Sequence, residues 1–178
     1  EDGLVVGRNG DWRWFDHLYN VDEDVLENAW YYSAIKFSQK MADILDDHRF
    51  DSFLAERAES ILQNFDRRYF QQGGYYSSKG IVDDRANAMA VLSGLCKEEN
   101  YPQIRTILLS VFNATVYMEN YILTALCKMG YRKDAYHRMM SRYYNLAKNE
   151  NSTLWEDFYI LGTKNHAWSG SPATIAFR

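Results

Sequence analysis

Two uncharged stretches decide the fold of this chain: Ala86–Cys96, with the sequence ANAMAVLSGLC, and Asn120–Cys127, with the sequence NYILTALC. Neither stretch carries a charged side chain, over eleven and eight residues respectively. A helix that lacks a polar face has to be covered on every side. The two stretches therefore predict buried helices, over about residues 84–97 and 117–129.

The helices expected around these two have a polar face. Residues 51–70 place apolar side chains at i, i+4 and i+7 and charged side chains opposite them, as a surface helix does. Residues 132–148 show the same amphipathic pattern, with Met140 expected to point inward and Arg138 and Arg142 outward. The remaining expected helices are less regular and lie at 24–46, at 102–112 and from about His166.

Buried and surface helices alternate from the third helix onward. Connections from a surface helix to the next buried one are mostly the longer ones, at 71–83, 113–116 and 149–165, and the segment 1–23 precedes the first helix. An inner ring of helices inside an outer ring, joined hairpin by hairpin, produces this pattern. The sequence therefore predicts an all-α fold, a partial (α/α) toroid of about three and a half hairpins in one domain. An open solenoid of hairpins is the alternative, although solenoids rarely have inner helices this apolar.

Composition and charge exclude several classes of function. The 178 residues suffice for one domain with a real core, and 47% apolar residues exclude a disordered chain. A net charge of −4 without a basic stripe argues against nucleic-acid binding. There is no run of about eighteen apolar residues that would span a membrane. The first residue is Glu rather than Met, so we expect a piece of a longer polypeptide, and the sequence assigns no compartment.

The cysteines and histidines do not predict a cofactor. Cys96 and Cys127 both lie in apolar helical stretches, where a small buried side chain is the better explanation of a cysteine. The four histidines lack the paired spacing of a zinc site. We therefore expect neither a metal nor another cofactor.

The longer connections all meet at one end of the predicted ring, where functional residues tend to concentrate. They hold acidic and aromatic residues with few cations: Asp11, Trp12, Trp14, Asp16, Tyr75, Tyr76, Asp83, Asp84, Tyr117, Glu119, Trp155, Glu156, His166 and Trp168. This composition suits a neutral polyhydroxylated ligand better than a phosphate, which calls for Arg, Lys or a glycine-rich loop. A sugar ring can lie on an aromatic face while a carboxylate and an imidazole bind its hydroxyls.

Each of these residues also has a purely structural explanation. Asp83 or its neighbour Asp84 precedes a helix and is suited to be its N-cap. Glu119 lies in a first helical turn, where the helix dipole favours a carboxylate. Trp12 is explained as a loop anchor packed on the core. For Trp155–Glu156, a buried Trp beside a solvated Glu is the commoner arrangement.

Five short motifs, in this order along the chain, together resemble one known family: Gly10–Trp12, Asp83–Ala88, Tyr117–Glu119, Ser152–Glu156 and Asn165–Gly170. They look like the C-terminal half of the catalytic domain of the bacterial α-L-rhamnosidases, glycoside hydrolase family 78. The last two motifs are the most specific. The resemblance implies an (α/α)6 toroid, a six-hairpin barrel, of which residues 1–178 form the C-terminal part.

The resemblance also implies an activity, the hydrolysis of terminal α-L-rhamnosides with inversion. Members of the family use two carboxylic acids, one to protonate the leaving oxygen and one to activate water. By this resemblance Glu156 is the expected general base, and His166 matches a histidine that binds a rhamnose hydroxyl. Asp11 and Trp12 match sugar-subsite residues. The other residues that we expect to bind substrate are Asp83, Trp155 and Trp168.

One part of the family pattern is absent from this sequence. The family's general acid lies in the N-terminal half of the barrel, and no motif here supports Asp83 or Asp11 in that role. We expect the missing N-terminal half, or a second copy of the chain, to cover the apolar inner helices. The expected ligand is a rhamnose-containing glycoside or oligosaccharide. Two alternatives stay open: another six-hairpin hydrolase such as an unsaturated-uronide hydrolase, and a non-catalytic domain that binds a glycan or a partner.

Overall fold

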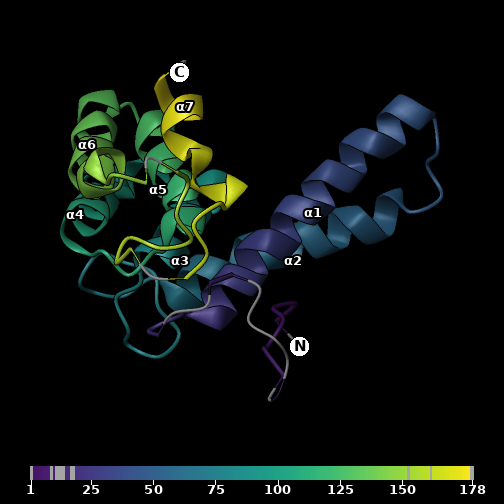
Figure 1. Ribbon diagram of the computed structural model, residues 1–178. Helices are drawn as coiled ribbons and strands as arrows, with labels where there is room; N and C mark the ends of the chain where they lie inside the picture. The colour runs from purple at the N-terminus through teal and green to yellow at the C-terminus, as the bar shows by residue number, and fades with distance from the viewer. Residues whose placement is uncertain are drawn as a thin grey trace.

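The computed structural model describes residues 2–8, 10, 15–16, 19–151, 153–160 and 162–176. The regular structure of these residues is helical, apart from one antiparallel bridge between Phe70 and Tyr76. The helices, shown in Figure 1, are α1 Glu23–Leu45, α2 Asp51–Tyr69, α3 Asp84–Ser93, α4 Tyr101–Ser110, α5 Val116–Lys128, α6 Arg132–Lys148 and α7 Ser171–Ala176, with the 3₁₀ helices η1 Glu98–Asn100 and η2 Ala167–Gly170. The all-α prediction is confirmed.

The helices form the inner and outer layers that the sequence predicts. α1, α3, α5 and α7 pack side by side in chain order, and α2, α4 and α6 each pack against the inner helix that precedes them. Every inner helix begins at the same end of the molecule (Figure 1). The connections at 70–83, 111–115 and 149–170 therefore meet at that end. The described residues form three hairpins and one further inner helix of a toroid.

The two uncharged stretches are buried, as predicted. In α3 every residue from Asp84 to Val91 is buried, and in α5 Ile122 and Leu126 have no exposed surface. α3 ends at Ser93, four residues earlier than expected, because Gly94 adopts a left-handed conformation with φ of +88°. Glycine enters this region without the steric penalty of a Cβ, so it commonly terminates a helix.

The prediction that Arg138 and Arg142 point outward and Met140 inward is wrong, since the Arg142 side chain is only 14% exposed. Arg138 is buried in the structure, whereas the Met140 side chain is 46% exposed. The amphipathic pattern fails here because Arg138 finds buried carboxylates as partners, at Asp84 and Glu119. A charged side chain can be buried when it is paired and hydrogen-bonded.

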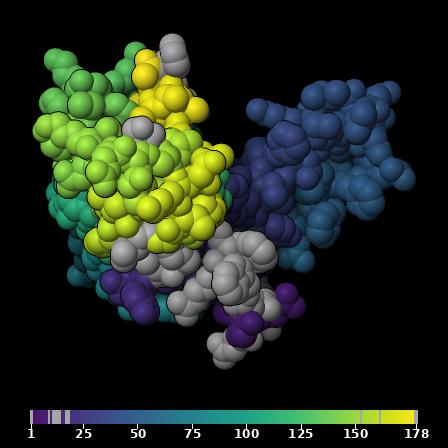
Figure 2. Space-filling view, in the orientation of Figure 1, coloured from purple at the N-terminus to yellow at the C-terminus, as the bar shows by residue number. Residues whose placement is uncertain are grey.

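The exposed apolar surface lies on the α1–α2 hairpin rather than on the inner helices α3 and α5, which are expected from the sequence to need a cover. α3 and α5 are covered by their neighbours, whereas the far half of the α1–α2 hairpin stands clear of the other helices (Figure 2). α1 has 23 residues and α3 only 10, so α1 extends well beyond the inner helix beside it. The apolar side chains that are more than half exposed on this hairpin are Phe37, Ile44, Leu45, Phe50 and Phe53.

The two cysteines are free and take the positions expected of small apolar residues. Cys96 is buried and Cys127 packs against the core. Burial raises the pKa of the Cys96 thiol to about 11, which disfavours the reactive thiolate. Among the helices of the described residues, none is both long and apolar enough to cross a membrane.

Candidate functional site

The connection between α6 and α7 folds back on itself and brings two sequence motifs together. The backbone N–H of His166 donates to the carbonyl oxygen of Leu154 at 2.6 Å. The N–H of Glu156 donates to the carbonyl oxygen of Thr163 at 3.0 Å. Glu156 therefore lies in the same small hairpin as His166, ten residues later in the sequence.

The Glu156 carboxylate is held by Thr163, on the opposite strand of this hairpin. Its Oε2 accepts hydrogen bonds from the backbone N–H of Thr163 at 2.7 Å and from the Thr163 hydroxyl at 2.9 Å. Gly162 allows this approach, because it has a φ of +75° and a Cβ placed there would lie 2.5 Å from Oε2. The hairpin thus fixes one carboxylate oxygen of a half-buried acid.

A row of aromatic rings continues from this hairpin across the inner helices. His166 stacks on Trp168 with the ring centroids 4.1 Å apart, and Trp168 lies 5.4 Å from Tyr117 of α5. Tyr117 meets Tyr121 edge-on at 5.8 Å, and Tyr121 meets Trp30 of α1 at 5.4 Å. The five rings join the connection before α7 to α5 and α1.

Only part of this row of rings is predicted by the sequence. Tyr117, His166 and Trp168 belong to the expected functional end, but Tyr121 and Trp30 lie within helices and have no loop signal. One signal was present, because Tyr121 follows Tyr117 by four residues and so shares its helix face. Burial, with a hydrogen bond to Tyr117, raises the pKa of Tyr121 to about 12.

Asp83 serves as the N-cap of α3. Its side chain accepts hydrogen bonds from the backbone N–H of Arg85 at 3.1 Å and from the Arg85 guanidinium at 2.7 Å. It also accepts one from the backbone N–H of Asp22 at 2.9 Å, and it has no exposed surface. Burial raises the pKa of Asp83, while Arg85 acts in the opposite direction. These contacts favour the capping explanation over the substrate-binding role expected for Asp83.

Arg85 ties the segment before α1 to the helices of the ring. It lies 3.3 Å from Asp16 and donates to the carbonyl oxygens of Tyr19 and Asn20, each at 2.9 Å. Asp16 in turn accepts a hydrogen bond from the N–H of Thr115 at 2.9 Å. The role of Arg85 is therefore structural, since its guanidinium is buried among carboxylates and carbonyls.

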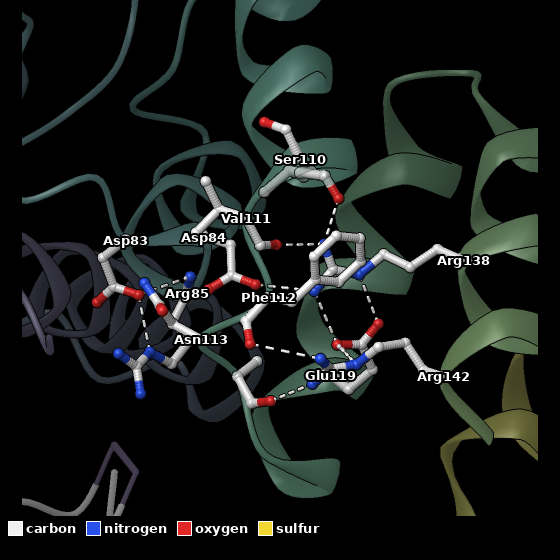
Figure 3. Close-up of polar contacts among 12 residues, drawn as sticks. Asp83, Asp84, Arg85, Ser110, Val111, Phe112, Asn113, Glu119, Arg138 and Arg142 are labelled. Atoms are coloured by element: carbon white, nitrogen blue, oxygen red, sulfur yellow. Dashed lines mark hydrogen bonds and ion pairs between the residues drawn. The ribbon is translucent and has the colours of Figure 1, made fainter. Parts of the chain in front are cut away.

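A second buried ionic cluster joins α3, α5 and α6 (Figure 3). Glu119 of α5 accepts two hydrogen bonds from Arg138, at 2.6 and 2.9 Å, and lies 3.5 Å from Arg142. Arg138 also donates to Asp84 of α3 at 2.8 Å. Burial raises the pKa of Asp84 to about 6 against the attraction of Arg138. The cluster contains two acids and two arginines.

The arginines of this cluster also bind backbone carbonyls at the end of α4 and in the connection between α4 and α5. Arg138 donates to the carbonyl oxygens of Leu108 and Val111, and Arg142 to those of Phe112 and Ala114. Backbone carbonyls that are buried without a partner cost free energy, so these contacts stabilise the connection. The two arginines are therefore engaged in the fold at this end of the ring.

Trp155 is placed differently from the other aromatic residues of its loop. Its side chain is 3% exposed and lies in the wall of an apolar groove of about 650 Å³ between α6 and α7. The Ser169 hydroxyl donates to its carbonyl oxygen. This position favours a packing role for Trp155 over sugar stacking, whereas Trp168 is 37% exposed.

Two of the expected substrate-binding residues, Asp11 and Trp12, lie outside the described residues. Within the described ranges, no group of three or more His, Cys, Asp and Glu side chains is arranged to hold a metal ion. The geometry therefore assembles Glu156, His166 and Trp168, and it places Asp83 and Trp155 in the packed interior.

Comparisons with known proteins bear on the family and the fold of this chain. The family model described as the bacterial alpha-L-rhamnosidase 6 hairpin glycosidase domain matches residues 3–178. Among solved structures, the chain is similar to the GH78 family rhamnosidase of Bacillus sp. GL1, with a TM-score of 0.79 and 17% sequence identity. The similarity covers 97% of this chain and 21% of that chain, so this chain spans about a fifth of that protein's length. A search of curated proteins found no match.

Proposed function

The chain belongs to the bacterial α-L-rhamnosidase six-hairpin glycosidase family, and we propose that it supplies the general base of an enzyme that hydrolyses terminal α-L-rhamnosides with inversion. The observation that carries this proposal is the connection between α6 and α7, whose hairpin holds Glu156 and His166 and continues into the His166–Trp168 stack. A carboxylate on the same hairpin as an aromatic and imidazole surface suits a sugar ring better than a charged ligand. The substrate proposed for the complete protein is a rhamnose-containing glycoside or oligosaccharide.

The proposed mechanism assigns one role to each of these residues. Glu156 takes a proton from the attacking water, while Thr163 fixes the direction of its carboxylate. His166 donates to a sugar hydroxyl, and Trp168 lies against the apolar side of the ring. In an inverting enzyme the second carboxyl lies about 6.5–9.5 Å away, across the sugar, and protonates the leaving oxygen.

We assign the second carboxyl to the part of the barrel outside this chain. Asp83 and Asp84 are both buried, with Arg85 and Arg138 as their respective partners. A general acid has to reach the glycosidic oxygen, and neither side chain has exposed surface from which to do so. The site of the complete protein is then built from two halves of the toroid.

Hydrolysis of p-nitrophenyl glycosides by the complete protein tests the proposed activity. Release from the α-L-rhamnoside alone, with β-L-rhamnose as the first product by NMR, is the expected result. Release from another sugar would favour a different six-hairpin hydrolase. Binding of a rhamnoside without turnover would favour a non-catalytic glycan-binding domain.

Replacement of His166 by Ala should act on sugar binding as much as on turnover. A donor to a hydroxyl stabilises the bound substrate and the transition state alike, so KM is expected to rise and kcat/KM to fall by about tenfold. Steady-state kinetics of the complete protein measure both values. His137→Ala, an exposed histidine of α6, is the matched control and should leave both unchanged. Equal effects of the two variants would contradict the proposed role of His166.

The isolated 178-residue chain should self-associate and lack rhamnosidase activity. Its two open edges are apolar: the far half of the α1–α2 hairpin and the groove between α6 and α7. Covering such surface gains roughly 25 cal/mol per Å², so the edges should pair in the absence of the rest of the barrel. Analytical ultracentrifugation, with an assay of the same sample, measures both properties.

A charged variant of the exposed edge provides the control for this experiment. Phe37→Glu with Ile44→Glu changes two side chains that are already exposed, so it should reduce association without unfolding the chain. The activity should stay absent, because the second carboxyl is still missing. A monomeric wild-type chain that cleaves the rhamnoside would contradict this proposal.

A further inference from the structure

The hairpin that carries Glu156 has a second attachment to the ring, at Phe158. The Arg142 guanidinium carbon lies 3.9 Å from the centroid of the Phe158 ring. The Tyr143 and Phe158 rings meet edge to face, with a centroid distance of 5.0 Å and an interplanar angle of 80°. Both partners come from α6, so two consecutive residues of one helix hold the same ring.

The Arg142 side chain is also held in place by contacts other than the one with Phe158. Its Nε lies 3.5 Å from the buried Glu119, and its terminal nitrogens donate to the carbonyl oxygens of Phe112 and Ala114. Burial lowers the pKa of Arg142 and Glu119 opposes that shift, and an arginine remains charged in either case. A planar cation held on one edge offers its face to an aromatic ring.

The hydrogen bonds within the hairpin cannot by themselves fix Glu156 relative to the rest of the site. The bonds between Glu156 and Thr163 join the two strands of the hairpin to each other. They do not join the hairpin to the helices of the ring. Trp155, directly before Glu156, packs beside α6 and α7, and Phe158, two residues after Glu156, contacts α6 as a second point of attachment.

We propose that Arg142 is a positioning residue for the reaction. Through its contact with the Phe158 ring, Arg142 holds the Glu156 carboxylate within hydrogen-bond distance of the attacking water. The proposal rests on the proposed role of Glu156 as general base. Proton transfer requires hydrogen-bond distance between base and water, and a displacement of about 1 Å can cost a hundredfold in rate. The buried ionic cluster of α3, α5 and α6 thus extends, through one ring contact, to the catalytic loop.

Three substitutions in the complete protein test the contact between cation and ring. Phe158→Leu keeps an apolar side chain but removes the aromatic face, and it should lower kcat by about 10- to 100-fold with KM changed less than about threefold. Phe158→Tyr keeps the face and should retain most of the activity. Arg142→Lys keeps the charge but not the planar group, and it should resemble Phe158→Leu.

Tyr159→Ala is the matched control, since Tyr159 follows Phe158 in the same loop and is 71% exposed. It should leave kcat unchanged. If Phe158→Leu and Phe158→Tyr lose the same activity, or neither loses any, the aromatic contact with Arg142 does not position the base and the proposal is wrong.

Hydrogen exchange separates this inference from the assignment of Glu156. The Thr163 amide, which donates to Glu156, should exchange faster in Phe158→Leu than in the wild type or in Tyr159→Ala. This readout does not depend on catalysis, so it holds even if Glu156 is not the base. In the kinetic arm, Phe158→Leu combined with Glu156→Gln should be no slower than Glu156→Gln alone. An unchanged Thr163 amide in Phe158→Leu, or additive kinetic losses, would overturn the proposal.

Discussion

Replacement of Glu156 by Gln in the complete protein is expected to lower kcat by about three orders of magnitude or more, with KM little changed. The amide has the size of the carboxylate and can still accept the hydrogen bonds that Thr163 donates. It cannot take a proton from water. The loss therefore falls on the chemical step, and steady-state kinetics with a rhamnoside measure it.

The matched control for this substitution is Glu150→Gln. Glu150 lies on the same connection between α6 and α7, and it is exposed. The change removes the same charge from the same part of the surface, so any general electrostatic effect should appear in both variants. Near-normal turnover in Glu156→Gln, or equal losses in the two, would remove Glu156 from the mechanism.

The helical architecture could be predicted because the burial of a helix determines where its sequence can carry charged residues. Ala86–Cys96 and Asn120–Cys127 lack charges since α3 and α5 are surrounded, and the amphipathic pattern of residues 51–70 marks an outer helix. The pattern fails at Arg138 for a physical reason. Its charge is compensated by residues 54 and 19 positions away, and no local periodicity reports partners at such distances.

The exposed face could not be located from the sequence for a similar reason. Whether an apolar side chain such as Phe37 is covered depends on the length of the neighbouring helix. α3 ends at Ser93, so within the described part of the chain no inner helix lies beside the far half of α1. The sequence predicts that apolar surface needs a cover, but the packing of the ring decides where.

In the candidate site as well, the sequence indicates which residue types are present but not where each side chain lies. The sequence places Glu156, His166 and Trp168 in or next to one connection at the expected functional end, and the structure folds this connection into a hairpin that leads into η2. Residue type could not separate Trp168 from Trp155, which the structure buries beside α6 and α7. An indole serves equally well as a packing group and as a sugar platform, and only its surroundings distinguish the two.

The largest expected effect on stability comes from Glu119→Gln. Glu119 is the carboxylate shared by Arg138 and Arg142, and it has no exposed surface. Neutralising it leaves two guanidinium groups with Asp84 as the remaining acid of the cluster. Removing one partner of a buried ion pair costs about 3–5 kcal/mol, because the other charge stays buried without compensation. Hydrogen exchange of the α5 and α6 amides in the complete protein measures the opening free energy of this region.

Asp134→Asn separates the effect of burial from that of the ion pair itself. Asp134 accepts from the Nε of Arg105 at 2.6 Å, the same distance as between Glu119 and the Nε of Arg138, but the side chains of Asp134 and Arg105 are both partly exposed. Water compensates the charge that is left behind, so this change should cost less than about 1 kcal/mol. If the two substitutions lower the opening free energy equally, the cluster does not stabilise this end of the ring through buried charge pairing. A much larger loss of opening free energy in Glu119→Gln would show that the buried pair stabilises the fold more than an exposed pair of equal distance. Glu119 would then also stabilise the position of Arg142, which contacts Phe158.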